Sequence, residues 1–166
     1  MIKIITKSYI NRKCRRALKN INTGLDFPVA VSMVKKVLVF LPKDLQLLEE
    51  ANSLTQQLRQ TYNSWTVDIF DVDKLKKEDY NRFKAPNHKI VENLKDGNYN
   101  LVIDLNKQFN LTSAYLAVMT GAPYRINMDA AGSSFFNIQY STSHNNNENS
   151  NYNHLLSHLL KLFPKN

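Results

Sequence analysis

The sequence predicts an α/β fold, a three-layer sandwich whose mostly parallel, Rossmann-like sheet of about five strands follows a basic N-terminal helix. Residues 101–105 (LVIDL) form a short apolar run, typical of a strand buried on both faces. After a loop, small and apolar residues recur at helical spacing over residues 111–119, and Gly121 supplies a left-handed helix stop. Another strand follows from Pro123. This succession implies a right-handed crossover between parallel strands.

The first expected element is a basic amphipathic helix over residues 8–21. A linker that ends at Pro28 separates this helix from the rest of the chain. The sequence therefore suggests a helix and linker over residues 1–28 and a single Rossmann-like domain over residues 29–166. The apolar stripe of the helix consists of Ile10, Cys14, Ala17, Leu18 and Ile21, and the basic residues away from it are Arg12, Lys13, Arg15, Arg16 and Lys19.

Strands and helices alternate through the remaining chain. The strand order is expected to be 2-1-3-4-5, counted along the sequence. Residues 142–153 are rich in Asn and lack aliphatic side chains, so a mobile loop is expected there. The strands are expected at residues 34–41, 65–70, 101–105, from 123, and at 135–141; helices are expected at 44–62, 87–95, 111–119 and 152–163, with a short helix or turn at 74–83.

Length and cysteine content narrow the class of protein. A chain of 166 residues is expected to form one domain with its own core. Cys14 is the only cysteine, so no intramolecular disulfide can form, and its place on the apolar stripe indicates packing rather than reactivity. We find no pattern of a secretory signal or a membrane-spanning helix. A cytoplasmic protein is therefore expected.

The net charge of +8 is concentrated at the N-terminus, where residues 1–20 hold seven basic and no acidic residues. The helix there has three interpretations, given in order of preference. Its stripe docks on its own domain or on a protein partner, a second copy included. Alternatively, Ile10, Leu18 and Ile21 insert into an anionic membrane surface at the inner face. In the third, the basic residues contact nucleic-acid phosphates.

Three consecutive motifs resemble the acceptor-side half of family 9 glycosyltransferases, the lipopolysaccharide heptosyltransferase group. They are the strand LVIDL, a small-residue helix that ends in TGA at residues 120–122, and the strand YRI at residues 124–126. The resemblance extends loosely over residues 34–163. The chain also looks like small bacterial proteins of unassigned function that place a basic helix before one such domain.

The resemblance implies a glycosyltransferase with a catalytic base after the first strand, for which Asp44 is the candidate. It also implies an acceptor site near Asp104 and Arg125. The chain departs from the family pattern in three places. The nucleotide-sugar half has no counterpart in these residues, the turn before Asp44 holds Pro42 in place of glycine, and Asn127 follows the Arg-Ile strand where glycine is usual.

Two of these acidic residues also have structural interpretations. Asp44 stands where it would cap the helix that follows, and we favour the cap over a general base. Asp104 lies at the carboxyl end of a parallel strand, where α/β sheets bind ligands, and Asn106 would join it there. We favour the alternative in which Asp104 orders the loop that leads to Asn110.

No cofactor and no metal are expected. The glycines are too scattered for a Gly-x-Gly-x-x-Gly or a P-loop motif. His154 and His158 have the i, i+4 spacing of metal ligands, with His144 in the loop before them, but they lie opposite the apolar stripe of their helix and are expected to face solvent. Ser133 and Ser134 are weak candidates for holding an anion.

Three functions remain open on these observations. The favoured one is a non-catalytic or vestigial single domain that acts as a binding or interaction module. The second is a glycosyltransferase subunit that needs a separate nucleotide-sugar-binding chain. The third is an adaptor that reaches a membrane surface or a nucleic acid through the basic N-terminal helix.

Overall fold

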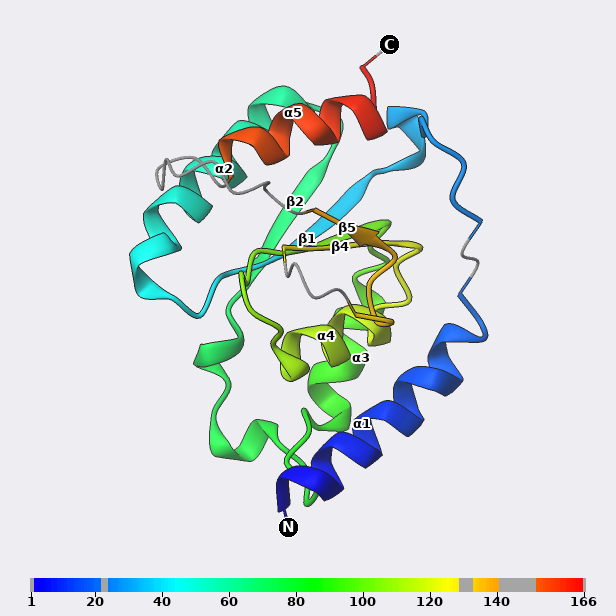
Figure 1. Cartoon of the computed structure of the whole chain (residues 1–166), viewed down its shortest axis with the longest axis vertical. Helices are drawn as coiled ribbons and strands as arrows, with labels where there is room; N and C mark the ends of the chain where they lie inside the picture. The colour runs from blue at the N-terminus through cyan, green and yellow to red at the C-terminus, as the bar shows by residue number, and fades with distance from the viewer. Residues whose placement is uncertain (1, 22–23, 129–132, 141–151, 166) are drawn as a thin grey trace.

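The computed structural model describes residues 2–21, 24–128, 133–140 and 152–165. Within them, five parallel strands form one sheet in the order β2-β1-β3-β4-β5 (Figure 1). The predicted fold class and strand order are therefore confirmed. The strands are β1 (Lys36–Phe40), β2 (Thr66–Phe70), β3 (Leu101–Asp104), β4 (Tyr124–Asn127) and β5 (Ile138–Gln139).

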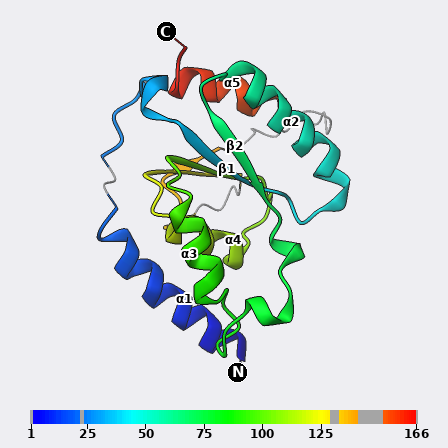
Figure 2. The same cartoon turned by 180° about the vertical axis from the view of Figure 1, so that it is seen from behind.

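Helices cover both faces of the sheet (Figures 1 and 2). Successive side chains of a strand point to opposite faces, so each strand contributes to two cores. In β1, Val37 and Val39 pack under α2 and α5, whereas Leu38 and Phe40 pack under α1, α3 and α4. The helices are α1 (Ile2–Leu18), α2 (Leu48–Thr61), α3 (His88–Asp96), α4 (Leu111–Met119) and α5 (Asn153–Leu162).

The N-terminal helix is packed into the domain. α1 lies against α4 (Figure 2). Ile10 and Cys14 of α1 are buried in the core beneath the helix. Ile10 is only 1% exposed, so this side chain is not available for insertion into a membrane, and the membrane interpretation as a whole stays a prediction. The helix also begins earlier than predicted, since no glycine or proline interrupts residues 2–8. Among the described helices, none combines the length and the apolar content that crossing a membrane requires.

Several element ends differ from the prediction. β5 has two residues instead of the seven expected at 135–141, because Phe136 donates to the Ser133 carbonyl and closes a turn there. α2 begins only at Leu48, after a 3₁₀ turn over Leu45–Leu47. Residues 74–83 contain the short 3₁₀ helix Lys77–Asp79, in agreement with the short helix or turn expected there. The φ angle of 78° at Gly121 confirms the left-handed helix stop, whereas the predicted loop at 142–153 falls mostly outside the described residues.

The carboxyl ends of β1, β3 and β4 meet at one edge of the sheet. Strand pairing places Phe40 beside Asp104, and Asp104 beside Asn127. The chain order reverses between β1 and β3, and open α/β sheets bind ligands in the crevice at such a switch point. A ligand site is therefore expected at this edge.

Candidate functional site

Asp104 ends β3 with its side chain buried on the α4 side of the sheet, where it is 2% exposed. Its carboxyl group accepts three hydrogen bonds. The Ser113 hydroxyl donates to Oδ2 at 2.6 Å, and the Asn106 side-chain amide and backbone N–H donate to Oδ1 at 2.6 and 3.1 Å. These contacts join the end of β3 to the first turn of α4. The predicted role of Asp104 in ordering this loop is thus confirmed.

Burial raises the pKa of Asp104, while the hydrogen bonds from Ser113 and Asn106 act in the opposite direction. The loop is closed by Asn110, whose side-chain oxygen accepts from the Thr112 and Ser113 backbone N–H groups at 2.9 and 3.1 Å and caps α4. The carboxyl group is thus enclosed by donors from the loop after β3 and from the first turn of α4. This arrangement suits structural support of the sheet edge better than proton transfer to a ligand.

Asn106 connects two loops across the switch point. Its Oδ1 atom accepts from the Lys43 backbone N–H at 2.9 Å, while its amide nitrogen donates to Asp104. The loop after β1 is therefore tied to the loop after β3. The structure brings Asn106 and Asp104 together, as the sequence predicts, but the side-chain oxygen and nitrogen of Asn106 both bond within the protein.

Asp44 belongs to the same loop after β1 but points to solvent. Its side chain accepts from the Gln46 backbone N–H at 3.0 Å and caps the turn before α2. The preferred cap interpretation is confirmed, although the capped element is the 3₁₀ turn and not α2 itself. Ser133, another predicted site residue, accepts from the Phe135 N–H at 3.3 Å within its own turn, and Ser134 is exposed beside it.

Arg125 is 1% exposed and lies two residues before the end of β4. Its Nε donates to the Phe135 carbonyl at 2.9 Å and its Nη1 to the Ala122 carbonyl at 2.5 Å. Burial lowers the pKa of Arg125, an effect that the nearby Cys14 opposes. The predicted contact of Arg125 with a ligand has no support in this geometry, because the guanidinium group braces the backbone around β4 instead.

Cys14 is buried beneath α1, and burial raises the pKa of its thiol to about 12, with Arg125 acting in the opposite direction. A thiol with so high a pKa stays protonated at neutral pH and is a poor nucleophile. The structural interpretation of this residue is thereby supported.

Two residues at this edge were missed by the sequence analysis. Asn127 is 2% exposed and shares a sheet face with Asp104, and neither polar atom of its side chain has a partner among the described residues. Tyr152 donates from its hydroxyl to the Leu105 carbonyl at 2.7 Å. The only sequence signal for Asn127 was a polar residue at the end of a buried strand; Tyr152 had none beyond its place in a helical stripe.

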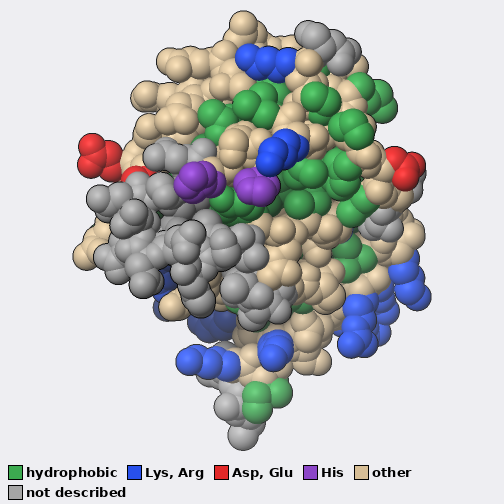
Figure 3. All heavy atoms as spheres, turned by 45° about the horizontal axis from the view of Figure 1, so that its top comes forward, with side chains coloured by type: hydrophobic (Ala, Val, Ile, Leu, Met, Phe, Trp, Pro, Cys, Tyr) green, Lys and Arg blue, Asp and Glu red, His purple; other side chains and the backbone are tan. Residues whose placement is uncertain are grey.

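The predicted histidine pair lies at the surface. His154 and His158 are exposed, and the His158 ring contacts Tyr140 at a centroid separation of 5.0 Å. Figure 3 shows histidine side chains at the surface beside hydrophobic side chains. His144 lies outside the described residues. Within the described part of the chain, no three His, Cys, Asp or Glu side chains are grouped closely enough to hold a metal ion.

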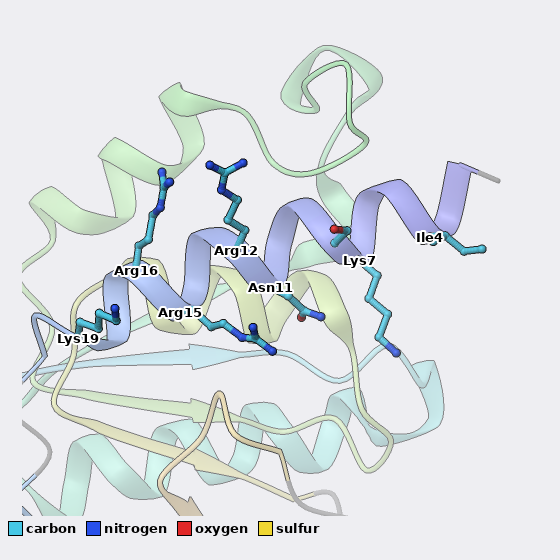
Figure 4. Close-up of a pocket in the computed structure, with 8 residues that line it drawn as sticks. Ile4, Lys7, Asn11, Arg12, Arg15, Arg16 and Lys19 are labelled. Atoms are coloured by element: carbon cyan, nitrogen blue, oxygen red, sulfur yellow. The ribbon is translucent and has the colours of Figure 1, made fainter.

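A second candidate site follows the outer side of α1, opposite the buried Ile10 and Cys14. Here side chains form a shallow groove of about 550 Å³ (Figure 4). Arg12 and Arg16 extend to one side of the helix, whereas Lys7 and Arg15 extend to the opposite side. None of them forms an ion pair with a described residue. We call the exposed basic residues Lys7, Arg12, Arg15, Arg16 and Lys19 the basic face of α1.

Comparisons with known proteins identify no relatives. No family model matches the chain, and no match was found among curated proteins or among solved structures. The resemblance to the acceptor half of family 9 glycosyltransferases therefore stays a prediction.

Proposed function

We propose that this protein is a non-catalytic binding module that holds the phosphates of a nucleic acid along the basic face of α1. One observation carries the proposal: five cationic side chains are exposed along a single helix, without an acidic partner among the described residues. Unpaired cations in a row favour a polyanion, because each phosphate contact releases condensed counterions.

The packing of α1 supports a rigid binding element. Ile10 and Cys14 hold the helix on α4, so the basic side chains start from fixed positions. From Lys7 to Lys19 the helix rises about 18 Å at 1.5 Å per residue. This length corresponds to about five base-pair steps of B-form DNA at 3.4 Å each. Three of the five cations are arginines, whose planar guanidinium groups match phosphate geometry.

A nucleic acid fits this surface better than a membrane does. An interfacial helix needs an apolar face to insert between lipids, and the apolar stripe of α1 is already packed in the core. Ile4 and Ile5 are exposed at 74% and 48%, but they lie at one end of the helix and do not form a stripe along it. Peripheral attachment to an anionic membrane is therefore the competing outcome of the test.

The two carboxyl groups at the carboxyl ends of the strands support the non-catalytic part of the proposal. The Asp104 carboxyl group is enclosed by donors from the loop after β3 and from the first turn of α4, and Asp44 caps a turn at the surface. Neither group has the setting of a general base that awaits a substrate. A vestigial relative of a glycosyltransferase acceptor domain would retain such a sheet edge for structural reasons.

Fluorescence anisotropy with labelled single-stranded and duplex oligonucleotides over a salt series tests the proposal. We expect the logarithm of the affinity to fall linearly with the logarithm of the salt concentration. Neutralising three cations (Arg12→Gln, Arg16→Gln, Lys19→Gln) should reduce that slope by about three and the affinity by at least about tenfold.

The matched control neutralises three exposed lysines outside α1 (Lys35→Gln, Lys161→Gln, Lys165→Gln), which removes the same net charge. Equal losses in the two triple variants would overturn the proposal, since the charge and not the face would then matter. Binding to phosphatidylserine vesicles without binding to oligonucleotides would assign the basic face to a membrane surface instead.

A second candidate function rests on Asn127. Its unpartnered amide beside Asp104 favours a small polar ligand at the sheet edge, as in a glycosyltransferase subunit completed by a separate nucleotide-sugar-binding chain. Saturation-transfer NMR with monosaccharides, comparing the wild type with Asn127→Ala, tests this alternative. A sugar signal that disappears in the variant would support it, and the lack of any signal from the wild type would remove it.

A further inference from the structure

An aromatic cleft of about 590 Å³ lies beside the basic face, between α1, the start of α3, the end of α4 and the loop over residues 80–87. Tyr9 and Lys13 line it from α1, Arg82 and Phe83 from the loop, and Tyr115 from α4. Lys13 immediately follows Arg12 of the basic face. The cleft and the groove on the outer side of α1 therefore share one helix.

The loop that carries Arg82 and Phe83 is built to hold its shape. The Asn81 side-chain oxygen accepts from the Phe83 and Ala85 backbone N–H groups at 2.8 and 3.3 Å. The Asn81 and Ala85 backbones also bond to each other at 2.8 Å, and Lys84 adopts a φ of 58°, which turns the chain back on itself. This bonding fixes where Phe83 stands relative to α1.

The exposed part of the cleft consists of two stacked aromatic rings with a cationic side chain next to each. The Tyr9 and Phe83 rings stack with centroids 4.7 Å apart and planes 21° apart. The Arg82 Cζ atom lies 4.7 Å from the centre of the Phe83 ring, and the Lys13 Nζ atom lies 5.9 Å from that of Tyr9. Because Tyr9 covers one face of Phe83, Arg82 has to cover the other. Arg82 is an exposed side chain and is held by no ion pair with a described residue, so a planar ligand can displace it.

Charge in the cleft also favours a phosphate. Lys13 and Arg82 contribute two positive charges, and Glu92 is the single acidic residue of the lining, where its Oε1 atom lies 3.6 Å from the His88 Nε2 atom. Aromatic faces bordered by cations are the combination that binds an unpaired base together with its phosphate. Aliphatic lipid chains would gain little from the stacked rings.

We propose that this cleft binds an unpaired base of single-stranded nucleic acid, which stacks on Phe83 in place of Arg82 while the backbone continues onto the basic face of α1. The inference rests on the proposed function and specifies its partner as a single strand. A duplex keeps its bases stacked on each other, so it can use the basic face but not the cleft.

The test compares single-stranded and duplex oligonucleotides of equal length by fluorescence anisotropy. Phe83→Leu keeps an apolar side chain but removes the ring, and it should lower the single-strand affinity by about tenfold while the duplex affinity stays unchanged. Phe83→Tyr keeps the ring and serves as the matched control, with affinity near that of the wild type. Arg82→Gln alters only an exposed side chain, and it removes a cation that, once displaced from the Phe83 ring, stays beside the phosphate of the bound strand. It should therefore weaken single-strand binding several-fold without affecting folding.

A single strand that contains 2-aminopurine gives a direct readout, because the fluorescence of this base changes when it stacks on an aromatic ring. We expect that change with the wild type and not with Phe83→Leu. If Phe83→Leu and Arg82→Gln bind single strands as the wild type does while the triple variant of the basic face loses binding, the cleft inference is overturned and the proposed function stands. If the wild type binds neither single strands nor duplex, both are overturned.

Discussion

The Ser113 hydroxyl donates a 2.6 Å hydrogen bond to Oδ2 of the buried Asp104 carboxyl group. Ser113 belongs to the first turn of α4 and Asp104 ends β3, so this contact sets how the helix leaves the sheet. Ser113→Ala removes a donor from a carboxyl group that is shielded from water. We expect the free energy of unfolding to fall by about 1.5 to 3 kcal/mol, measured by urea denaturation with Trp65 fluorescence.

The control for this prediction is Ser157→Ala. The Ser157 hydroxyl also donates a 2.7 Å hydrogen bond, in this case to the His154 carbonyl of its own helix, but Ser157 is exposed. Its loss should change the free energy of unfolding by less than about 0.5 kcal/mol. Equal effects of the two substitutions would mean that the Ser113–Asp104 hydrogen bond contributes no more to the free energy of unfolding than an exposed one does.

Asp104 predicts a particular dependence of stability on pH. Burial raises its pKa above the ordinary value of 3.8, so the folded protein holds this proton more tightly than the unfolded chain does. The stability contributed by the group is then complete below about pH 3.8 and is lost as the pH rises through the folded pKa. The difference in unfolding free energy between the wild type and Asp104→Asn should fall over this window and become constant above it. Urea denaturation at a series of pH values measures this difference, and a rise with pH would contradict the prediction.

Asn127 and Asn137 allow the stability cost of an amide without hydrogen bonds to be compared with the effect of a hydrogen-bonded one. Both polar atoms of the Asn137 side chain are hydrogen-bonded, since the oxygen accepts from the Arg125 backbone N–H at 2.8 Å and the nitrogen donates to the Pro123 carbonyl at 2.7 Å. Asn137→Leu should therefore lower the free energy of unfolding by about 1 to 3 kcal/mol. Asn127→Leu removes polar atoms that have no described partner and should raise it by about 1 kcal/mol. Thermal and urea denaturation of both variants provide the comparison; a destabilised Asn127→Leu would indicate that water or a ligand satisfies the amide.

Ile10 tests the attachment of α1, on which the proposed function depends. It is 1% exposed beneath the helix, whereas Ile4 on the same helix is 74% exposed. Ile10→Ala should lower the free energy of unfolding by about 2 to 5 kcal/mol, because a buried cavity remains, and Ile4→Ala should change it by less than about 0.5 kcal/mol. Urea denaturation of both variants measures the difference. A helix that is not docked in solution would give similar, small effects for both residues.

Much of the fold could be predicted from local patterns. The apolar run at 101–105, the helical spacing after it and Gly121 each depend on a few neighbouring residues, and all three have the predicted structure. The short β5 was predicted too long, because its length depends on a turn closed between Ser133 and Phe136 and on pairing with β4. Pairing between distant segments leaves little trace in either segment alone.

Some features of the candidate sites could likewise be predicted from the sequence, and others could not. The position of Asp104 at a strand end followed from the sequence, and so did the excess of positive charge at the N-terminus. The enclosure of Asp104 by Asn106 and Ser113 and the use of Arg125 as a backbone brace did not follow, because these contacts form only when the loops are folded. The aromatic cleft had no signal at all, since Tyr9 and Phe83 are 74 positions apart.

By itself, then, the sequence determined the α/β class and the segregation of charge, because periodicity and composition are properties of consecutive residues. The strand order followed only from the general topology of alternating strands and helices. Only the tertiary structure decided which groups remain available to a partner. Docking on α4 buries the apolar stripe of α1 and leaves its cations exposed, and the same docking brings Tyr9 to Phe83. The reason is physical: a side chain is available when the fold leaves it without a partner, and that depends on residues far away in the chain.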